Sequence, residues 1–185
     1  MNTAFVYIRP KKVAFVRVRG SYAASSIEAW NSVFDWLEDH GLKSPVGRGY
    51  GLMHDNPRLV PPARCRYDAC IEVPLGAEEL LPDHISTQIL PGGAYARERH
   101  TGGIGGLRDK IARLRDEWAP ANGIAVDAKR PFIEIFYDDP AVVPEERWTI
   151  DVCVPVVVSA TKTMSRGGEA TFPASDFAPP PIIAS

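Results

Sequence analysis

The sequence predicts an α+β protein in which two copies of one β-α-β-β unit form a curved antiparallel sheet, with two long helices packed on one side. The first observation is an internal repeat, because DNPRLVP at residues 55–61 returns as DDPAVVP at residues 138–144. Two further segments return in the same order, with offsets between 81 and 83 residues: 13–20 at 95–102, and 66–74 at 147–155. Such a repeat indicates two copies of a supersecondary unit. We call them unit 1 (about residues 10–75) and unit 2 (about 84–157), together forming one domain over residues 1–157.

Unit 1 is expected to contain a strand, a helix and two further strands. The strands are predicted at residues 12–19, 49–54 and 64–73, where β-branched and alternating apolar residues occur. Ser25 or Ser26 is suited to cap the helix, and Gly41 to end it in a left-handed conformation. The helix carries an apolar stripe at helical spacing: Ile27, Trp30, Phe34 and Leu37, with Val33 at its margin.

Unit 2 repeats this order. Residues 85–99 are rich in strand formers, with a break at residues 91–93, and two more strands are predicted at 132–137 and 148–156. The helix follows the glycine-rich segment 102–106, and its apolar stripe consists of Leu107, Ile111, Leu114 and Trp118. Residues 158–185 are rich in Ser, Thr, Ala, Gly and Pro, and we expect a disordered or loosely packed tail.

Composition favours a cytoplasmic protein with neither a membrane span nor a direct nucleic-acid partner. The chain has 185 residues, 45% hydrophobic and 24% charged, with a formal charge of −2, which gives little attraction to phosphate backbones. Its N-terminus lacks a signal peptide, and no apolar run reaches the roughly 20 residues that a membrane helix needs. Cys65, Cys70 and Cys153 lack a CxxC spacing and are expected to be reduced thiols.

No metal and no cofactor are expected. His54 and His100 have no Cys, His or carboxylate at metal-ligand spacing. The glycines of segment 102–106 precede a helix, but no lysine follows in the position of a phosphate-binding loop, and the dinucleotide pattern is absent.

Glu134 is the strongest candidate functional residue. Alternation in the strand PFIEIFY, residues 131–137, places it on one face with Phe132 and Phe136. A carboxylate beside aromatic rings costs free energy unless that face lines a cavity or meets a cation. Its repeat partner is Gly51, so the scaffold does not require this charge. The alternative is that the strand lies at an edge and Glu134 is exposed.

Two units related by a pseudo-twofold axis leave a cleft between them, which is a common place for a ligand. The repeat aligns Tyr67 with Trp148, and we expect these rings to face each other across the cleft. Trp30 and Trp118 belong to helix stripes, where core packing is the first explanation and a pocket wall the second. An aromatic face over a ligand cation contributes about 0.5–2 kcal/mol.

Short segments of both units carry a family resemblance. They are VRVRGSY (16–22), YGLMHDNP (50–57), YDACI (67–71), LPGGAYA (90–96), HTG (100–102), IEIF (133–136) and TIDVCVP (149–155). In this order they resemble the GyrI-like small-molecule-binding family, the effector-binding domain of AraC-type and MerR-type multidrug regulators. The resemblance covers about residues 10–157.

The resemblance implies a ligand cleft at the interface of the units. In the family, an acidic residue on the penultimate strand engages cationic or polar amphipathic ligands, and Glu134 occupies the matching position. The candidate ligand-binding residues are Glu134, Phe136, Phe132, Tyr67, Trp148, Tyr50, Met53 and Trp118. The chain departs from the regulators because its flanking segments leave no room for a helix-turn-helix. A stand-alone domain, or action through another polypeptide, is therefore expected.

Three functions are weighed. The first is binding of an amphipathic small molecule, expected to be cationic, by a sensing or sequestering module. The second is hydrolysis of electrophilic cyclopropane-containing toxins, with Glu134 as the catalytic carboxylate and Tyr67 or Tyr95 as a proton donor. The third is a protein partner, either a regulator or DNA gyrase, which the chain would inhibit.

Overall fold

The computed structural model describes residues 3–42, 48–73 and 78–157, and the predicted tail lies outside them. The strands are β1 (Ala4–Ile8), β2 (Lys11–Arg19), β3 (Gly49–Met53), β4 (Arg66–Glu72), β5 (Ser86–Leu90), β6 (Gly93–Thr101), β7 (Phe132–Phe136) and β8 (Thr149–Pro155). The helices are α1 (Tyr22–Asp39) and α2 (Leu107–Arg113), and α2 continues through a π-helical turn (Leu114–Trp118) into α3 (Ala119–Ala121).

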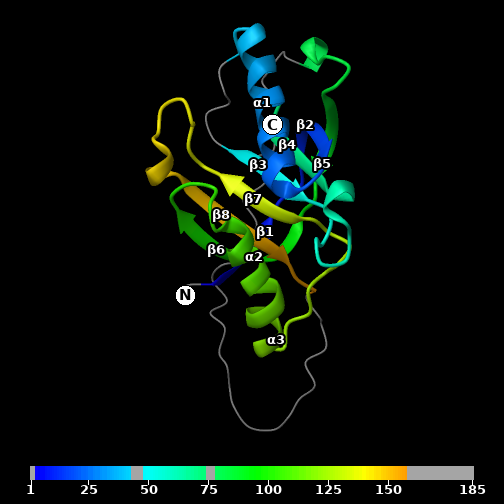
Figure 1. Cartoon of the computed structure of the whole chain (residues 1–185), viewed down its shortest axis with the longest axis vertical. Coiled ribbons are helices and arrows are strands. Elements are labelled where there is room, and N and C mark those ends of the chain that lie inside the picture. The colour runs from blue at the N-terminus through cyan, green and yellow to red at the C-terminus, as the bar shows by residue number, and fades with distance from the viewer. Residues whose placement is uncertain (1–2, 43–47, 74–77, 158–185) are drawn as a thin grey trace, which may run out of the picture.

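Within the described residues, the strands form one antiparallel sheet in the order β1-β6-β8-β7-β3-β4-β2-β5. The sheet is curled, with α1 and the α2–α3 segment at its two ends in the view of Figure 1, and both helices pack their apolar residues against the same sheet face. The predicted α+β class with duplicated units is confirmed. No helix among the described residues has the length and apolar composition needed to cross a membrane.

The two units meet at β3 and β7, which pair at the centre of the sheet. Gly51 lies opposite Glu134, and on either side Tyr50 lies opposite Ile135 and Leu52 opposite Ile133. Gly51 and Glu134 are also repeat copies of each other, so this is the opposed pair in which the two members correspond. The pseudo-twofold axis therefore passes between these two residues.

Each unit also gives one strand to the other. β1, which extends unit 1 at its N-terminal end, pairs with β6 of unit 2, and β5 of unit 2 pairs with β2 of unit 1. β1 was not predicted, because its five residues end just before Arg9 and Pro10, and Phe5 and Tyr7 are exposed. β1 and β5 are the outermost strands, so each half of the sheet ends with a strand from the other unit.

The strand ladders correct the predicted alignment of the last strand in each unit. Arg17 pairs with Asp68, and its repeat copy Arg99 pairs with Asp151. Asp68 thus corresponds to Asp151, an offset of 83 residues rather than the predicted 81. In this register Tyr67 corresponds to Ile150, and Trp148 corresponds to Cys65, so Tyr67 and Trp148 are not symmetry partners. The prediction was wrong because it matched aromatic residues instead of the buried Asp-x-Cys pattern.

Helix α1 has two apolar stripes. The stripe in contact with the sheet is fully buried and contains Tyr22, Ser25, Ala29, Val33, Trp36 and Leu37. The predicted stripe overlaps it at Val33 and Leu37, but Ile27 is 52% exposed, and Trp30 and Phe34 are half-buried. The helix starts at Tyr22, earlier than predicted, with Ser21 as its N-cap residue. Ser25 and Ser26 therefore lie inside the helix, where their hydroxyls donate to the carbonyls of Ser21 and Tyr22.

The other predicted features of the helices are confirmed. Gly41 follows α1 with a φ of 60°, the left-handed conformation expected there. Leu107, Ile111 and Leu114 are buried, and Trp118 packs against the same core. A second apolar cluster, containing Tyr50, Leu52, Tyr95, Ile133 and Ile135, fills the opposite face of the sheet. Both faces of β7 are therefore buried.

Candidate functional site

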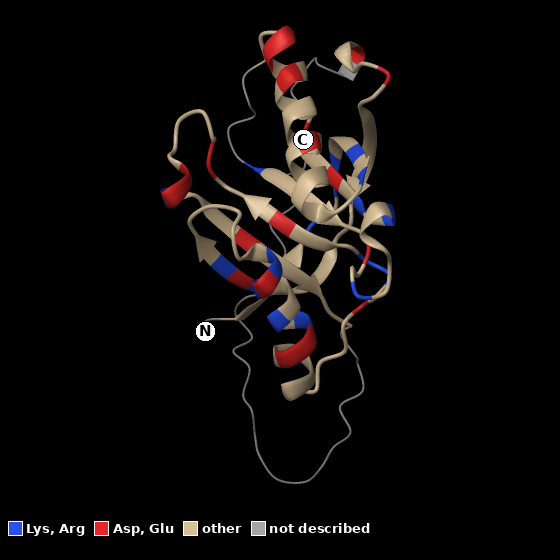
Figure 2. Cartoon of the chain, viewed as in Figure 1, with Lys and Arg blue, Asp and Glu red and all other residues tan. Residues whose placement is uncertain are grey.

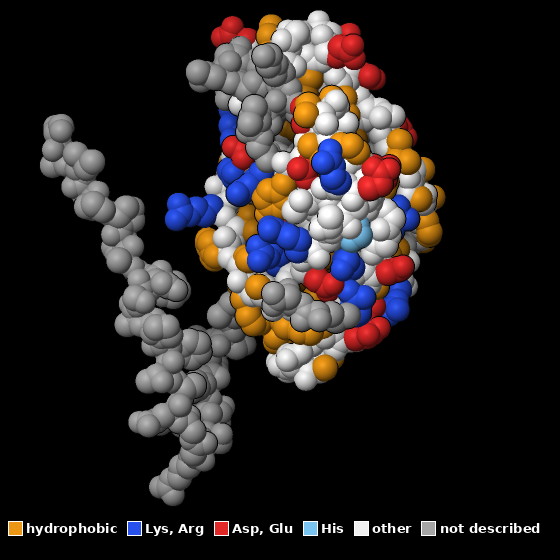
Figure 3. Space-filling view, turned by 90° about the vertical axis from the view of Figure 1, so that its left-hand side faces the viewer, with side chains coloured by type: hydrophobic (Ala, Val, Ile, Leu, Met, Phe, Trp, Pro, Cys, Tyr) orange, Lys and Arg blue, Asp and Glu red, His pale blue; other side chains and the backbone are white. Residues whose placement is uncertain are grey.

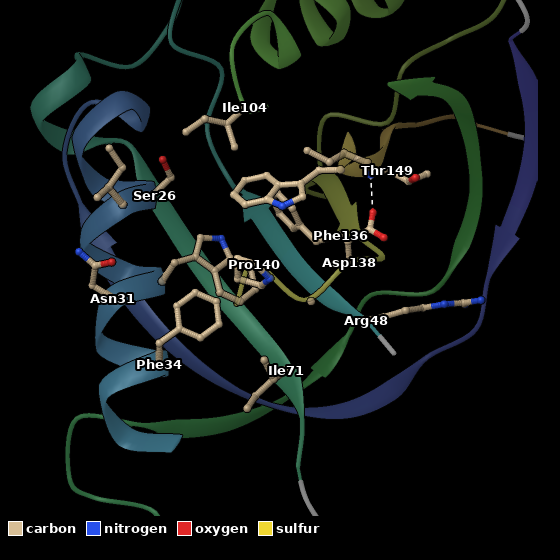
Figure 4. Close-up of a pocket in the computed structure, with 15 residues that line it drawn as sticks. Ser26, Asn31, Phe34, Arg48, Ile71, Ile104, Phe136, Asp138, Pro140 and Thr149 are labelled. Carbon is tan, nitrogen blue, oxygen red and sulfur yellow. Dashed lines mark hydrogen bonds between the residues drawn. The ribbon is translucent and has the colours of Figure 1, made fainter. Parts of the chain in front are cut away.

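A cavity of about 320 Å³ lies between α1, the ends of β7 and β8, and the 102–106 segment. Four aromatic side chains form its walls: Trp30 and Phe34 from α1, Phe136 from β7, and Trp148 just before β8. In Figure 4, α1 brings Ser26, Asn31 and Phe34 to one side, and Ile104 lies across the top. Both units line the cavity, so it is an interface site.

The aromatic walls are held in place by their neighbours. The Trp30 ring stacks on Phe34 with centroids 5.6 Å apart and meets Phe136 edge-on at 5.4 Å. On the other wall, Nε1 of Trp148 donates to the Val143 carbonyl at 2.8 Å. Aromatic surfaces with fixed orientations can bind a flat or cationic group with little loss of side-chain entropy.

Two glycines in β3 create the space behind these walls. A Cβ on Gly49 would lie 2.5 Å from the Trp30 ring, and a Cβ on Gly51 would lie 2.1 Å from the Tyr67 hydroxyl. Both glycines are on the face of β3 that meets α1. Because they carry no side chain, the indole of Trp30 and the phenol of Tyr67 approach the strand closely.

Glu134 lies behind the cavity wall, at the end of a short chain of hydrogen bonds. Nε1 of Trp30 donates to the Tyr67 hydroxyl at 3.1 Å, and this hydroxyl donates to Oε2 of Glu134 at 2.9 Å. Glu134 is 6% exposed and has no ion-pair partner among the described residues. Burial raises the pKa of Glu134 to about 7, against the opposing effects of the Tyr67 hydrogen bond and of the more distant Arg108 charge. The carboxyl group is thus poised to change charge near neutral pH.

The structure separates the predicted site residues into three groups. Phe136 and Trp148 line the cavity, and Glu134 and Tyr67 connect to it through Trp30. Phe132, Met53 and Trp118 belong to the core on the helix side of the sheet and do not line the cavity. The Arg115 guanidinium lies 5.7 Å from the centre of the Phe132 ring, and the ring centres of Trp118 and Phe5 are 5.8 Å apart.

Tyr50 and Tyr95 form the third group, on the opposite face of the sheet. The Tyr50 hydroxyl donates to Glu72 at 3.2 Å, and the Tyr95 hydroxyl donates to the Pro91 carbonyl at 3.3 Å. Both rings are fully buried in the second apolar cluster. Neither side chain is close to the cavity, so Tyr95 and Glu134 are on different sides of the sheet.

Sequence reasoning assigned Ile27, Trp30 and Phe34 first to core packing, and the structure places all three in the cavity wall. The apolar surface of α1 is wider than the sheet alone requires, because one stripe of the helix already packs on the sheet. This excess width is the sequence feature that indicates a second role for the three residues. Asp138, the first residue of the repeated segment 138–144, is another lining residue that was not predicted. It accepts a hydrogen bond from the Thr149 backbone (Figure 4).

The described residues contain no group of three side chains arranged to hold a metal ion. Cys65, Cys70 and Cys153 are buried free thiols, and burial raises the pKa of each. The chemistry available at the cavity is therefore that of aromatic rings, the charged side chains of Arg48 and Asp138, a few neutral polar groups, and the buried carboxyl group of Glu134 behind the wall.

Comparison with known proteins agrees with this architecture. Residues 1–157 match the GyrI-like small molecule binding domain. A DNA gyrase inhibitor from Erwinia billingiae is 26% identical over 159 residues, covering 84% of this chain and 97% of that protein. The probable transcriptional regulator YgiV from Escherichia coli K12 is 31% identical over 126 residues, covering 65% of this chain and 75% of the relative.

Solved structures show the same fold at low identity. The EcmrR C-terminal domain has a TM-score of 0.64 and 17% identity, covering 84% of this chain and 97% of that chain. In the EcmrR–DNA complex the match has a TM-score of 0.66 and 18% identity, covers 84% of this chain, and spans 57% of the EcmrR chain. SAV2435 bound to tetraphenylphosphonium has a TM-score of 0.55 and 10% identity, covering 85% and 94% of the two chains.

Proposed function

Because the chain belongs to the GyrI-like small molecule binding domain family, we propose that it binds amphipathic, cationic small molecules in the cavity and acts as a sensing or sequestering module. The observation that carries this proposal is the arrangement of Trp30, Tyr67 and Glu134, in which an aromatic wall is backed by a buried carboxyl group that forms no ion pair with a described residue. The cavity accommodates the apolar part of the ligand, and the Glu134 carboxylate favours a ligand with a positive charge.

The energetics favour a cation over a neutral ligand. Each aromatic face in contact with a cation contributes about 0.5–2 kcal/mol, and more when water is excluded. A carboxylate in a weakly polarisable interior acts over a longer distance than one in water. A cation in the cavity therefore stabilises the charged form of Glu134, although the Trp30 ring separates the two.

The SAV2435 structure supports the choice of ligand class, since tetraphenylphosphonium is an aromatic cation without hydrogen-bond donors. The same compound is a suitable probe here. Its neutral counterpart, triphenylphosphine oxide, has similar aromatic surface and no net charge.

The proposal is tested by titrating both compounds at about pH 8 and following tryptophan fluorescence. Glu134→Gln keeps an acceptor for the Tyr67 hydroxyl and removes the charge, and we expect it to weaken tetraphenylphosphonium binding about tenfold. The matched control Glu146→Gln changes an exposed carboxylate and should bind as the wild type does. Equal affinity of the wild type and Glu134→Gln for the cation would disprove the role of Glu134.

Hydrolysis is the second candidate function, because a carboxyl group with a pKa of about 7 next to a phenol can exchange protons at neutral pH. An electrophilic cyclopropane substrate is incubated with the protein, and the small molecule is recovered and analysed by mass spectrometry. Recovery of a hydrolysed product that requires Glu134 supports an enzyme. Recovery of the unchanged compound supports binding alone.

Inhibition of DNA gyrase is a third candidate, and the name of the Erwinia relative is the observation that favours it. A supercoiling assay with gyrase, with and without this protein, tests it directly. We expect supercoiling to slow if the chain binds gyrase, and an unchanged rate at excess protein would reject this function.

A further inference from the structure

The face of the sheet opposite the helices carries two buried ion pairs related by the pseudo-twofold axis. In unit 1, Asp68 is fully buried and accepts from Nε and Nη2 of Arg17 at 2.6 and 2.7 Å. In unit 2, Asp151 is fully buried and accepts from Nε and Nη2 of Arg99 at 2.8 and 3.0 Å. Burial opposes ionisation, but these hydrogen bonds lower the pKa of both carboxyl groups. Because both units contain this arginine–aspartate pair at the same position, we assign the pair to the structure of the repeated unit.

Two further arginines lie near this second ion pair, Arg97 from unit 2 and Arg48 from unit 1. Arg97 occupies the position of Phe15 in unit 1, and its Nη1 lies 3.4 Å from Oδ2 of Asp151. Arg48 precedes β3, and its guanidinium lies 5.2 Å from the centre of the Tyr137 ring. The Arg99 guanidinium lies at the same distance from this ring. Arg48 and Arg99 thus contact one aromatic ring, and Arg97 and Arg99 contact one aspartate, so Arg99 links the other two arginines.

The carboxylates nearby are already occupied. Asp151 accepts from the Tyr137 hydroxyl at 2.8 Å in addition to Arg99, which leaves only the long contact to Arg97. Glu72 accepts from Lys11 at 2.6 Å and from the Tyr50 hydroxyl at 3.2 Å, and the more distant Arg48 charge also lowers its pKa. With Glu72 balanced by Lys11, the charges of Arg48, Arg97 and Arg99 exceed the charge of Asp151 by two.

The guanidinium groups are accessible and have donors left over. The side chain of Arg99 is 53% exposed and that of Arg97 is 31% exposed. Arg48 is exposed and donates no hydrogen bond to a residue that the structure describes. Figure 2 shows basic residues on both sides of an acidic one along β6, and Figure 3 shows basic side chains gathered among hydrophobic ones on the side of the molecule where β6 and β8 lie.

We propose that Arg48, Arg97 and Arg99 form an anion site that binds a phosphoryl group, as free phosphate or as a small phosphate monoester. Guanidinium forks match the geometry of phosphate oxygens, and a surplus of two positive charges suits a dianion. The Arg48 and Arg99 guanidinium groups both pack on the Tyr137 ring, which holds these two donors close together. Because Arg48 also lines the rim of the cavity, the anion site and the cavity are neighbours.

The proposal is tested by titrating inorganic phosphate and phenyl phosphate separately, at constant ionic strength, while the arginine Nε–Hε resonances are followed by NMR. We expect saturable shifts, and we expect Arg97→Gln and Arg48→Gln each to raise Kd about tenfold, since each removes a charged hydrogen-bond donor. Tighter binding of phenyl phosphate than of phosphate identifies monoesters as the ligand class. Equal Kd values identify the free anion.

The variants are expected to fold, because Asp151 keeps Arg99 and Tyr137 as donors. A second variant, Arg97→Phe, copies the unit 1 residue and should weaken phosphate binding as Arg97→Gln does. Arg58→Gln removes an exposed arginine that pairs with Asp116, and serves as the matched control. Shifts without saturation, or an equal loss in Arg58→Gln and Arg97→Gln, would overturn the anion site, since the effect would then be general charge screening.

Discussion

Gly51 and Glu134 lie directly opposite each other in neighbouring antiparallel strands, at the axis that relates the two units. A Cβ at position 51 would lie 2.7 Å from Oε2 of Glu134 and 2.1 Å from the hydroxyl oxygen of Tyr67. The glycine of unit 1 thus makes room for the carboxyl group of unit 2 and for the hydroxyl that binds it.

We predict that Gly51→Ala destabilises the protein by about 1–3 kcal/mol, because the methyl group overpacks a buried polar contact. Urea unfolding measures the change. Combining it with Tyr67→Phe removes the closest oxygen, so the alanine should cost less in that background. Gly105→Ala, whose Cβ meets nothing within 4 Å, should change stability by less than about 0.5 kcal/mol. Equal costs at positions 51 and 105 would contradict this explanation.

The free energy of unfolding should depend on pH through Glu134. The pKa of this group is about 7 in the folded protein and ordinarily 4.5, so between these values the folded state holds more protons than the unfolded state. Stability from this group is therefore present below pH 4.5 and falls as pH rises to 7, by roughly 3 kcal/mol. Glu134→Gln removes this dependence.

Urea unfolding of the wild type and of Glu134→Gln at several pH values tests that prediction, because all other groups titrate alike in both proteins. The difference in unfolding free energy should grow in favour of glutamine as pH rises through the window. Parallel pH curves would show that Glu134 titrates normally in the folded state.

Cation binding should have the opposite pH dependence. A bound cation favours ionised Glu134, so affinity for tetraphenylphosphonium should increase from about pH 6 to about pH 8, as the fraction of carboxylate rises. Glu134→Gln should bind with an affinity that is independent of pH in this range. Fluorescence titrations at each pH give both profiles, and a flat wild-type profile would argue against a direct charge effect.

Phe136 and Phe132 provide a matched pair for locating the ligand. They are on the same face of β7, but Phe136 lines the cavity, and Phe132 packs under Arg115 in the core. We predict that Phe136→Leu weakens tetraphenylphosphonium binding about fivefold through loss of an aromatic contact. Phe132→Leu should lower stability by about 1 kcal/mol and leave affinity unchanged. A larger loss of affinity in Phe132→Leu would place the ligand elsewhere.

The duplicated architecture could be predicted from the sequence because both units keep the segment at residues 55–61 and 138–144 and the same order of strands. The exact register could not be predicted from aromatic matches. Tyr67 and Trp148 are similar in type, but the buried Arg17–Asp68 and Arg99–Asp151 pairs decide the alignment. A charge buried in the same place in both units is a stronger constraint than a ring, since an unpaired carboxylate in the interior is costly.

The site was only partly predictable. Alternation correctly placed Glu134 on the same face as Phe136, but it does not show what covers that face. Trp30 comes from α1, and its contact with Tyr67 depends on how closely the helix approaches β3. That approach is set by Gly49, whose missing side chain has no signature in hydrophobic periodicity.

The exchange of β1 and β5 between the units explains how a single carboxyl group can lie on the pseudo-twofold axis. A separated unit would lack the strands that its neighbour supplies, so it would have to associate with an identical copy. In that symmetric pair, an acidic side chain on the axis would face its own duplicate, and two like charges in a water-poor interior repel strongly. Joining the copies in one chain lets the two central positions diverge, so that a single negative group can be kept at the middle of the sheet.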